Sequence, residues 1–145
     1  MIVYLDASAL VKRYVGEAGS PAVEALIGRA RTVGTGLVSR AEVVAALAKA
    51  ARVGIVTREA AARARAAFNA DWEHLVRLHL GEALVSRAAA LAWEQGLRGY
   101  DAVHLASALM WNEAMGEAVT VATYDRELWR GARASGLEAW PAAAR

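Results

Sequence analysis

Cysteine is absent from this 145-residue sequence, which excludes disulfides and thiolate metal ligands. Only carboxylates and imidazoles are left as metal ligands, and the three histidines form no pair at metal-ligand spacing. No uncharged stretch approaches the roughly 18 apolar residues of a membrane helix. The first predicted strand begins at Met1 or Ile2, so we expect no signal segment and a cytoplasmic protein.

Lysine is also scarce: Lys12 and Lys49 are the two lysines among the 17 basic residues. The net charge is +2, and the pI of about 9.3 reflects a slight excess of arginine. Total charge therefore argues little for a nucleic-acid partner. Because 57% of the residues are hydrophobic and charged residues are spread along the chain, we expect one folded domain over residues 1–145.

Apolar strands alternate with helical segments along the chain. The pattern predicts strands at 2–5, 32–38, 76–80, 118–124 and 137–140, and helices at about 8–14, 20–30, 39–54, 57–74, 82–95, 100–114 and 125–135. In the third strand, residues 76, 78 and 80 are expected to face inward. Strands that alternate with helices predict right-handed βαβ units and a mostly parallel sheet. The expected fold class is α/β, a three-layer α/β/α sandwich.

Acidic residues stand where the predicted strands end and the predicted helices begin. Asp6 ends the first strand and Asp125 the fourth, while Glu42 and Asp101 lie in the first turns of two helices. If these elements share one end of the sheet, four carboxylates converge on one cleft and repel one another unless a cation is present. An all-oxygen ligand set favours Mg²⁺ or Mn²⁺, which serve reactions at phosphate.

Each acid also has an ordinary structural interpretation. Asp6 and Asp125 are good helix caps, and first-turn acids such as Glu42 and Asp101 interact favourably with the helix dipole. The segment from Ser39 to Glu42 fits a capping box. Only the combination of all four acids indicates a site.

Ser8 and Thr123 have a similar alternative, as plain cap or turn residues. His104 lies three residues after Asp101 on the same helical face, where it could touch the site. A hydrogen-bonded core histidine is the favoured interpretation.

The acids belong to four longer segments, YLDASALVKRY at 4–14, SRAEV at 39–43, YDAVHLASAL at 100–109 and TYDREL at 123–128. Together these segments resemble the four motifs of PIN-domain ribonucleases, most closely the VapC-type toxins of toxin–antitoxin pairs. The resemblance covers nearly the whole chain. It implies a PIN fold, Mg²⁺- or Mn²⁺-dependent cleavage of RNA, a homodimer and inhibition by a partner antitoxin.

The resemblance also implies roles for individual residues. Its acidic quartet, which would hold the metal and activate a water for in-line attack, corresponds to Asp6, Glu42, Asp101 and Asp125. Its supporting hydroxyls correspond to Ser8 and Thr123. The expected products are a 5′-phosphate and a 3′-hydroxyl. The family usually has an aromatic residue where Leu128 stands, a departure that concerns packing.

RNA binding next to an acidic site requires cationic contacts. Six basic residues flank the motifs and are candidates for this role: Lys12, Arg13, Arg40, Arg98, Arg126 and Arg130. Two other function classes stay open. One is a catalytically silent PIN-like binding module that acts through a protein partner. The other is a phosphotransferase with Asp6 as nucleophile, although that chemistry usually has a second acid where this chain has Ser8.

Overall fold

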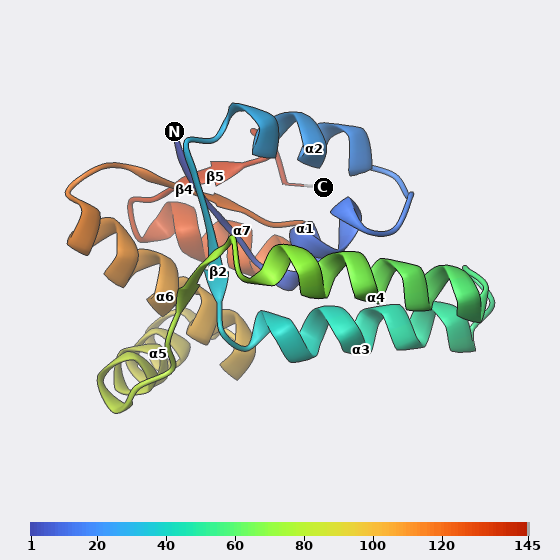
Figure 1. Ribbon diagram of the computed structural model, residues 1–145. Coiled ribbons are helices and arrows are strands. Elements are labelled where there is room, and N and C mark those ends of the chain that lie inside the picture. Colours follow the sequence, from blue (N-terminus) through green and yellow to red (C-terminus); the bar gives the residue numbers. More distant parts are fainter. Residues whose placement is uncertain (145) are drawn as a thin grey trace.

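The structure, a computed structural model, describes residues 1–144 and has a five-stranded sheet at its centre (Figure 1). The strands are β1 (Ile2–Leu5), β2 (Thr32–Gly36), β3 (Val76–Leu78), β4 (Val119–Ala122) and β5 (Glu138–Trp140). They pair in the order β3-β2-β1-β4-β5, and every pairing is parallel. The predicted α/β class is confirmed, and the carboxyl ends of the strands share one edge of the sheet.

Helices connect each strand to the next. The helical elements are α1 (Ala7–Leu10), the 3-10 helix η1 (Val11–Arg13), α2 (Ser20–Arg29), α3 (Ser39–Arg52), α4 (Arg58–Trp72), α5 (Glu82–Gln95), α6 (Gly99–Met115) and α7 (Arg126–Ala134). Figure 1 shows α3 and α4 side by side, and α5 and α6 form a second packed pair. No helix within residues 1–144 is both long enough and apolar enough to cross a membrane.

The sheet is covered on both faces, as the predicted three-layer sandwich requires. Side chains alternate along β1, so Ile2 and Tyr4 pack with α5, α6 and α7, whereas Val3 and Leu5 pack with α1 to α4. All four of these side chains are at most 1% exposed. The strand that ends at the candidate site is therefore fixed from both sides.

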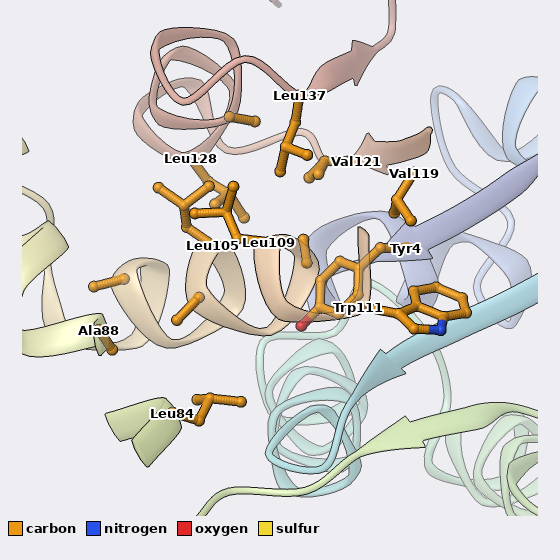
Figure 2. Packing of buried hydrophobic residues seen from close by; sticks show 14 of the residues in the cluster. Tyr4, Leu84, Ala88, Leu105, Leu109, Trp111, Val119, Val121, Leu128 and Leu137 are labelled. Atoms are coloured by element: carbon orange, nitrogen blue, oxygen red, sulfur yellow. The ribbon is translucent and has the colours of Figure 1, made fainter. Parts of the chain in front are cut away.

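Helix α6 is the most deeply buried helix of the layer that includes α5 and α7. Figure 2 shows Leu105 and Leu109 of α6 between Leu84 of α5 and Leu128 of α7. Burial of each leucine contributes roughly 1.5–3 kcal/mol. Because α6 also carries Asp101, this packing fixes that carboxylate against the carboxyl edge of the sheet.

The third strand differs from its prediction. It ends at Leu78, and Val76 and Leu80 are 38% and 41% exposed, so the inward direction expected for these two side chains is wrong. β3 lies at the edge of the sheet, where only β2 pairs with it, and its side chains are covered less completely. Only Leu78 packs against the hydrophobic core.

Candidate functional site

The candidate site starts where β1 and β4 end beside each other. Leu5 pairs with Ala122, the last residue of β4, so the residues that follow the two strands are also neighbours. These are Asp6 and Thr123. The amide of Asp6 donates to the Ala122 carbonyl at 3.3 Å, which continues the sheet by one contact. Two polar side chains 117 positions apart therefore meet at the carboxyl edge.

Hydroxyl groups surround the Asp6 carboxylate. Ser8 Oγ lies 2.7 and 2.9 Å from its two oxygens, and Thr123 Oγ1 donates to Oδ2 at 2.9 Å. The backbone amide of Ala9 donates to Oδ1 at 3.1 Å, so Asp6 also caps α1. The capping role and the site role are thus compatible. These donors fix the carboxylate rotamer, because each oxygen has at least two partners.

Asp6 is only 5% exposed, and it makes no ion pair with any residue in the range 1–144. Burial raises its pKa above the usual value, whereas the positive charge of His104 and the hydrogen bonds from Ser8 and Thr123 act in the opposite direction. A buried carboxylate that is held only by neutral donors strongly favours a cation beside it.

Glu42 is positioned by a buried hydrogen-bonded chain. His104 Nε2 lies 2.7 Å from Glu42 Oε1, and His104 Nδ1 lies 2.6 Å from the Tyr4 hydroxyl. A carboxylate can only accept, so Nε2 carries the proton that binds Glu42. In the neutral ring, Nδ1 then accepts from Tyr4. Any side chain at Gly36 would collide with these hydrogen-bonded residues, since an added Cβ would lie 2.7 Å from the Tyr4 hydroxyl oxygen.

His104 is 2% exposed, yet its pKa is raised above the usual value. Burial lowers the pKa of His104, but the hydrogen bond to Glu42 and the charges of Asp6, Glu42 and Asp101 raise it by more. His104 is thus a hydrogen-bonded core histidine, as predicted, and it also contacts a candidate ligand. The sequence spacing places His104 one helical turn after Asp101, but no local pattern indicates Tyr4 or the contact with Glu42.

Asp101 and Asp125 share one cation, Arg98. Arg98 Nε donates to Asp101 Oδ2 at 2.9 Å, and its Nη2 donates to Asp125 Oδ2. Asp125 also caps α7, as its Oδ1 accepts from the Leu128 amide at 2.9 Å. Burial and the charge of Asp125 raise the pKa of Asp101, while Arg98 lowers it. The guanidinium therefore offsets part of the repulsion between the two acids.

Three of the acids, Asp6, Asp101 and Asp125, are linked through shared partners, whereas Glu42 binds His104. Thr123 Oγ1 accepts from the Asp125 amide at 3.0 Å while it donates to Asp6. However, among residues 1–144 no three Asp, Glu or His side chains are arranged as a closed metal site. The predicted convergence is thus incomplete: three of the carboxylates bind the side chains of Arg98 and His104, and like-charged acids favour such separate partners.

The donor chemistry nevertheless fits a hard divalent cation. Asp6 and Asp101 are nearly buried, at 5% and 2% exposure, and burial raises the pKa of both, so a cation beside them would stabilise their ionised forms. All available ligand atoms are carboxylate oxygens, the type that Mg²⁺ and Mn²⁺ prefer. Asp6, Asp101, Glu42 and Asp125 could hold such an ion.

The capping box predicted from Ser39 to Glu42 is wrong. Ser39 is the first residue of α3, the N-cap is Val38, and no side chain caps this helix. Instead, the Thr35 hydroxyl lies 2.6 Å from the Leu5 carbonyl oxygen and 2.7 Å from the Ser39 hydroxyl. These contacts tie the start of α3 to the end of β1, and Glu42 is free to reach His104.

Two candidate RNA contacts in η1, Lys12 and Arg13, are engaged elsewhere. Lys12 donates to Glu17 at 3.2 Å and also lies over the ring of Tyr124, which follows β4, at 4.5 Å from the ring centre. Arg13 pairs with Asp71 of α4 at 3.3 Å. Both side chains therefore bind acidic residues that do not belong to the candidate site.

The remaining candidates lie on the surface. Arg40 lies over the Trp72 ring, with 5.7 Å between the guanidinium carbon and the ring centre, and Arg130 pairs with Glu127 at 3.4 Å. Arg126 follows Asp125 directly, is exposed, and forms no ion pair with the described residues. Arg126 is thus the cation beside the acids that is most available to a phosphate.

Comparisons with known proteins agree with this architecture. The PIN domain family model matches residues 3–134. Ribonuclease VapC45 and ribonuclease VapC49 of Mycobacterium tuberculosis are each 39% identical over 142 residues, covering 97% of this chain and 96% of the relative. A toxin-antitoxin complex from Klebsiella pneumoniae has a chain of the same fold, with a TM-score of 0.65 at 16% identity, covering 89% of this chain and 91% of that chain.

Proposed function

Because the chain belongs to the PIN-domain family, we propose that it is a VapC-type ribonuclease toxin that hydrolyses RNA phosphodiester bonds and is inhibited by a cognate antitoxin. One observation carries the chemistry: Asp6 is a buried carboxylate at the carboxyl edge of a parallel sheet and has only neutral hydrogen-bond donors. Parallel α/β sheets bind their ligands at this edge.

The catalytic assignment is part of the proposal. Asp6 and Asp101 would hold Mg²⁺ or Mn²⁺, with Glu42 and Asp125 completing the ligand set. When bound, the ion supplies an activated water and positive charge opposite the phosphate. Ser8 and Thr123 hold the Asp6 carboxylate in one rotamer, and His104 holds Glu42. Cleavage leaves a 5′-phosphate and a 3′-hydroxyl.

The partners are proposed from the family and from the toxin-antitoxin neighbour. RNA is the substrate, and a small antitoxin protein is the inhibitor. The chain acts as a single PIN-like domain and as a homodimer, which light scattering of the purified protein would test. Growth arrest on expression in a bacterial host, relieved by the product of an adjacent small gene, would support the toxin assignment.

A catalytically silent binding module is the second candidate, and Arg98 is the observation that favours it. Its ion pairs engage Asp101 and Asp125, two carboxylates that the nuclease needs for its metal. The Arg98 side chain is 53% exposed, however, and exposed ion pairs are weak. Weak ion pairs between Arg98 and these two acids are compatible with a nuclease.

The decisive experiment is a metal-dependence assay on labelled RNA. We expect cleavage by the purified chain to stop in excess EDTA and to return when Mn²⁺ is added in excess of the chelator. A control with Ca²⁺ in place of Mn²⁺ tests whether restored folding alone is sufficient for RNA cleavage. RNA cleavage that continues in chelator would reject the metal mechanism, and absence of cleavage with either Mg²⁺ or Mn²⁺ would favour the silent module.

A further inference from the structure

Arg98 holds the oxygen through which Asp125 would bind a cation. Asp125 Oδ1 accepts from the Leu128 amide and is used by the α7 cap, so Oδ2 is the oxygen left for another partner. Arg98 Nη2 donates to this Oδ2. Arg98 Nε donates to Asp101 Oδ2 as well. One guanidinium thus occupies an oxygen of each of two candidate metal ligands.

The guanidinium reaches these acids from the solvent side. The Arg98 side chain is 53% exposed, whereas those of Asp101 and Asp125 are 3% and 24% exposed. Arg98 precedes α6 in extended backbone, with φ −65° and ψ 151°, so it is not part of the packed helix. Its guanidinium carbon also lies 4.8 Å from the ring centre of Tyr100, a contact that needs no carboxylate. Arg98 can leave both acids without opening the core.

A guanidinium and a divalent cation compete for these oxygens, because the two cations repel each other and bind the same atoms. On the basis of the function proposed above, we propose that Arg98 is a built-in counter-ion of the carboxylate site. A divalent cation must displace it from Asp101 and Asp125, so Arg98 lowers the metal affinity of the RNA-free chain. This role differs from a phosphate contact, which would change RNA affinity and leave metal affinity unchanged.

The test is Mn²⁺ binding without RNA, measured by calorimetry or by electron paramagnetic resonance. We expect Arg98→Gln to bind Mn²⁺ about fivefold more tightly, or better, than the parent. Arg98→Lys, which keeps the charge but loses the fork of donors, should fall between the two. Arg87→Gln is the matched control: it also removes one positive charge, and it breaks the ion pair with Glu113 on a different part of the molecule, α5. Its Mn²⁺ affinity should equal that of the parent.

Thermal unfolding gives a second readout that does not depend on activity. Arg98→Gln should melt at a lower temperature than the parent in EDTA, because Asp101 and Asp125 lose their counter-ion. Added Mn²⁺ should raise the melting temperature of the variant by more than that of the parent. Circular dichroism at low temperature checks that the variant is folded.

Equal or weaker Mn²⁺ binding by folded Arg98→Gln, with measurable binding by the parent, would overturn the counter-ion role and leave the nuclease proposal intact. If Arg98→Gln changes RNA affinity but not Mn²⁺ affinity, the counter-ion role is likewise overturned and the nuclease proposal stays intact. Absence of Mn²⁺ binding by both parent and variant would overturn the nuclease proposal together with this inference.

Discussion

Asp6 and Asp101 are both almost completely buried, but the molecule accommodates their charges in different ways. Asp6 has neutral donors, the hydroxyls of Ser8 and Thr123 and one backbone amide. Asp101 has a cation, Arg98, which approaches from solvent. Neutral dipoles fix a carboxylate and leave its net charge uncancelled, whereas a guanidinium cancels the charge but can leave.

The site therefore has two sides, one around Asp6 and one around Asp101, and we expect them to behave differently. The Asp6 side is rigid, because its donors belong to α1 and to the residue after β4. The Asp101 side can exchange one cation for another. We therefore expect changes at Asp6 to abolish cleavage and changes near Arg98 to adjust it.

Loss of the Asp6 charge should have the largest effect. We expect Asp6→Asn to reduce RNA cleavage at least about 10²-fold, since removal of one preorganised electrostatic group typically costs this much or more. The fold should remain, and stability in metal-free buffer should rise or stay unchanged, because an uncompensated buried charge is removed. The assay compares single-turnover cleavage and melting temperature with those of Asp71→Asn, a partly exposed acid on α4. Parent-like cleavage by Asp6→Asn would reject the assignment.

Thr123 connects the two sides, so its loss should have the second largest effect. Thr123→Val removes the donor to Asp6 and the acceptor for the Asp125 amide. We expect cleavage to fall about 10- to 100-fold, as for other groups that orient metal ligands. Unfolding free energy should fall by about 1–3 kcal/mol.

The matched control for Thr123→Val is Thr120→Val. Thr120 is a buried threonine of β4 whose hydroxyl donates to Glu138 instead of a candidate ligand. Thr120→Val should lower stability with little change in cleavage. If both variants lose activity in proportion to stability, Thr123 has only a structural role.

Asp125 lies on the exchangeable side, and its loss should be milder. Asp125→Asn keeps a good N-cap for α7 and removes one exposed ion pair worth up to about 1 kcal/mol. We expect a decrease in cleavage of about fivefold, because the Asp125 side chain is 24% exposed and water screens its charge more than that of Asp6. Single-turnover kinetics at saturating Mn²⁺ measure it. A loss as large as that of Asp6→Asn would show that both sides are equally essential.

The smallest effect is expected at Arg126, outside both sides. Arg126→Gln should weaken RNA binding similarly for all sequences and reduce the slope of log affinity against log salt by about one. Filter binding in EDTA, at several salt concentrations, measures this without cleavage. Arg31→Gln is the control, because Arg31 precedes β2 at the opposite edge of the sheet and is exposed. Equal salt slopes for both variants would exclude a phosphate contact at Arg126.

The fold could be predicted because its signals are local. Each strand is a short apolar run, and helices between strands enforce a parallel sheet. The meeting of Asp6 and Thr123 then follows from topology, since β1 and β4 end at the same edge. The exposure of Val76 could not be predicted, because an alternating pattern does not reveal that β3 lies at the edge of the sheet.

The finer structure of the site was less accessible to sequence reasoning. The contact between Tyr4 and His104 spans 100 residues, and no local pattern marks it. A hydroxyl inside an otherwise apolar strand is the one available signal. Arg98 was identified as a basic residue beside a motif, but the sequence does not show whether its charge faces RNA or the acids. That choice depends on how far apart Asp101 and Asp125 lie in the fold.

The central claim is that Asp6 and Asp101, one on each side of the site, bind one hard cation. The most direct measurement is an anomalous difference map from crystals soaked in Mn²⁺. We predict a peak within roughly 2–2.5 Å of an oxygen of each residue, with the Arg98 guanidinium displaced. A map whose peaks all lie away from Asp6, with Arg98 still bridging Asp101 and Asp125, would contradict the claim.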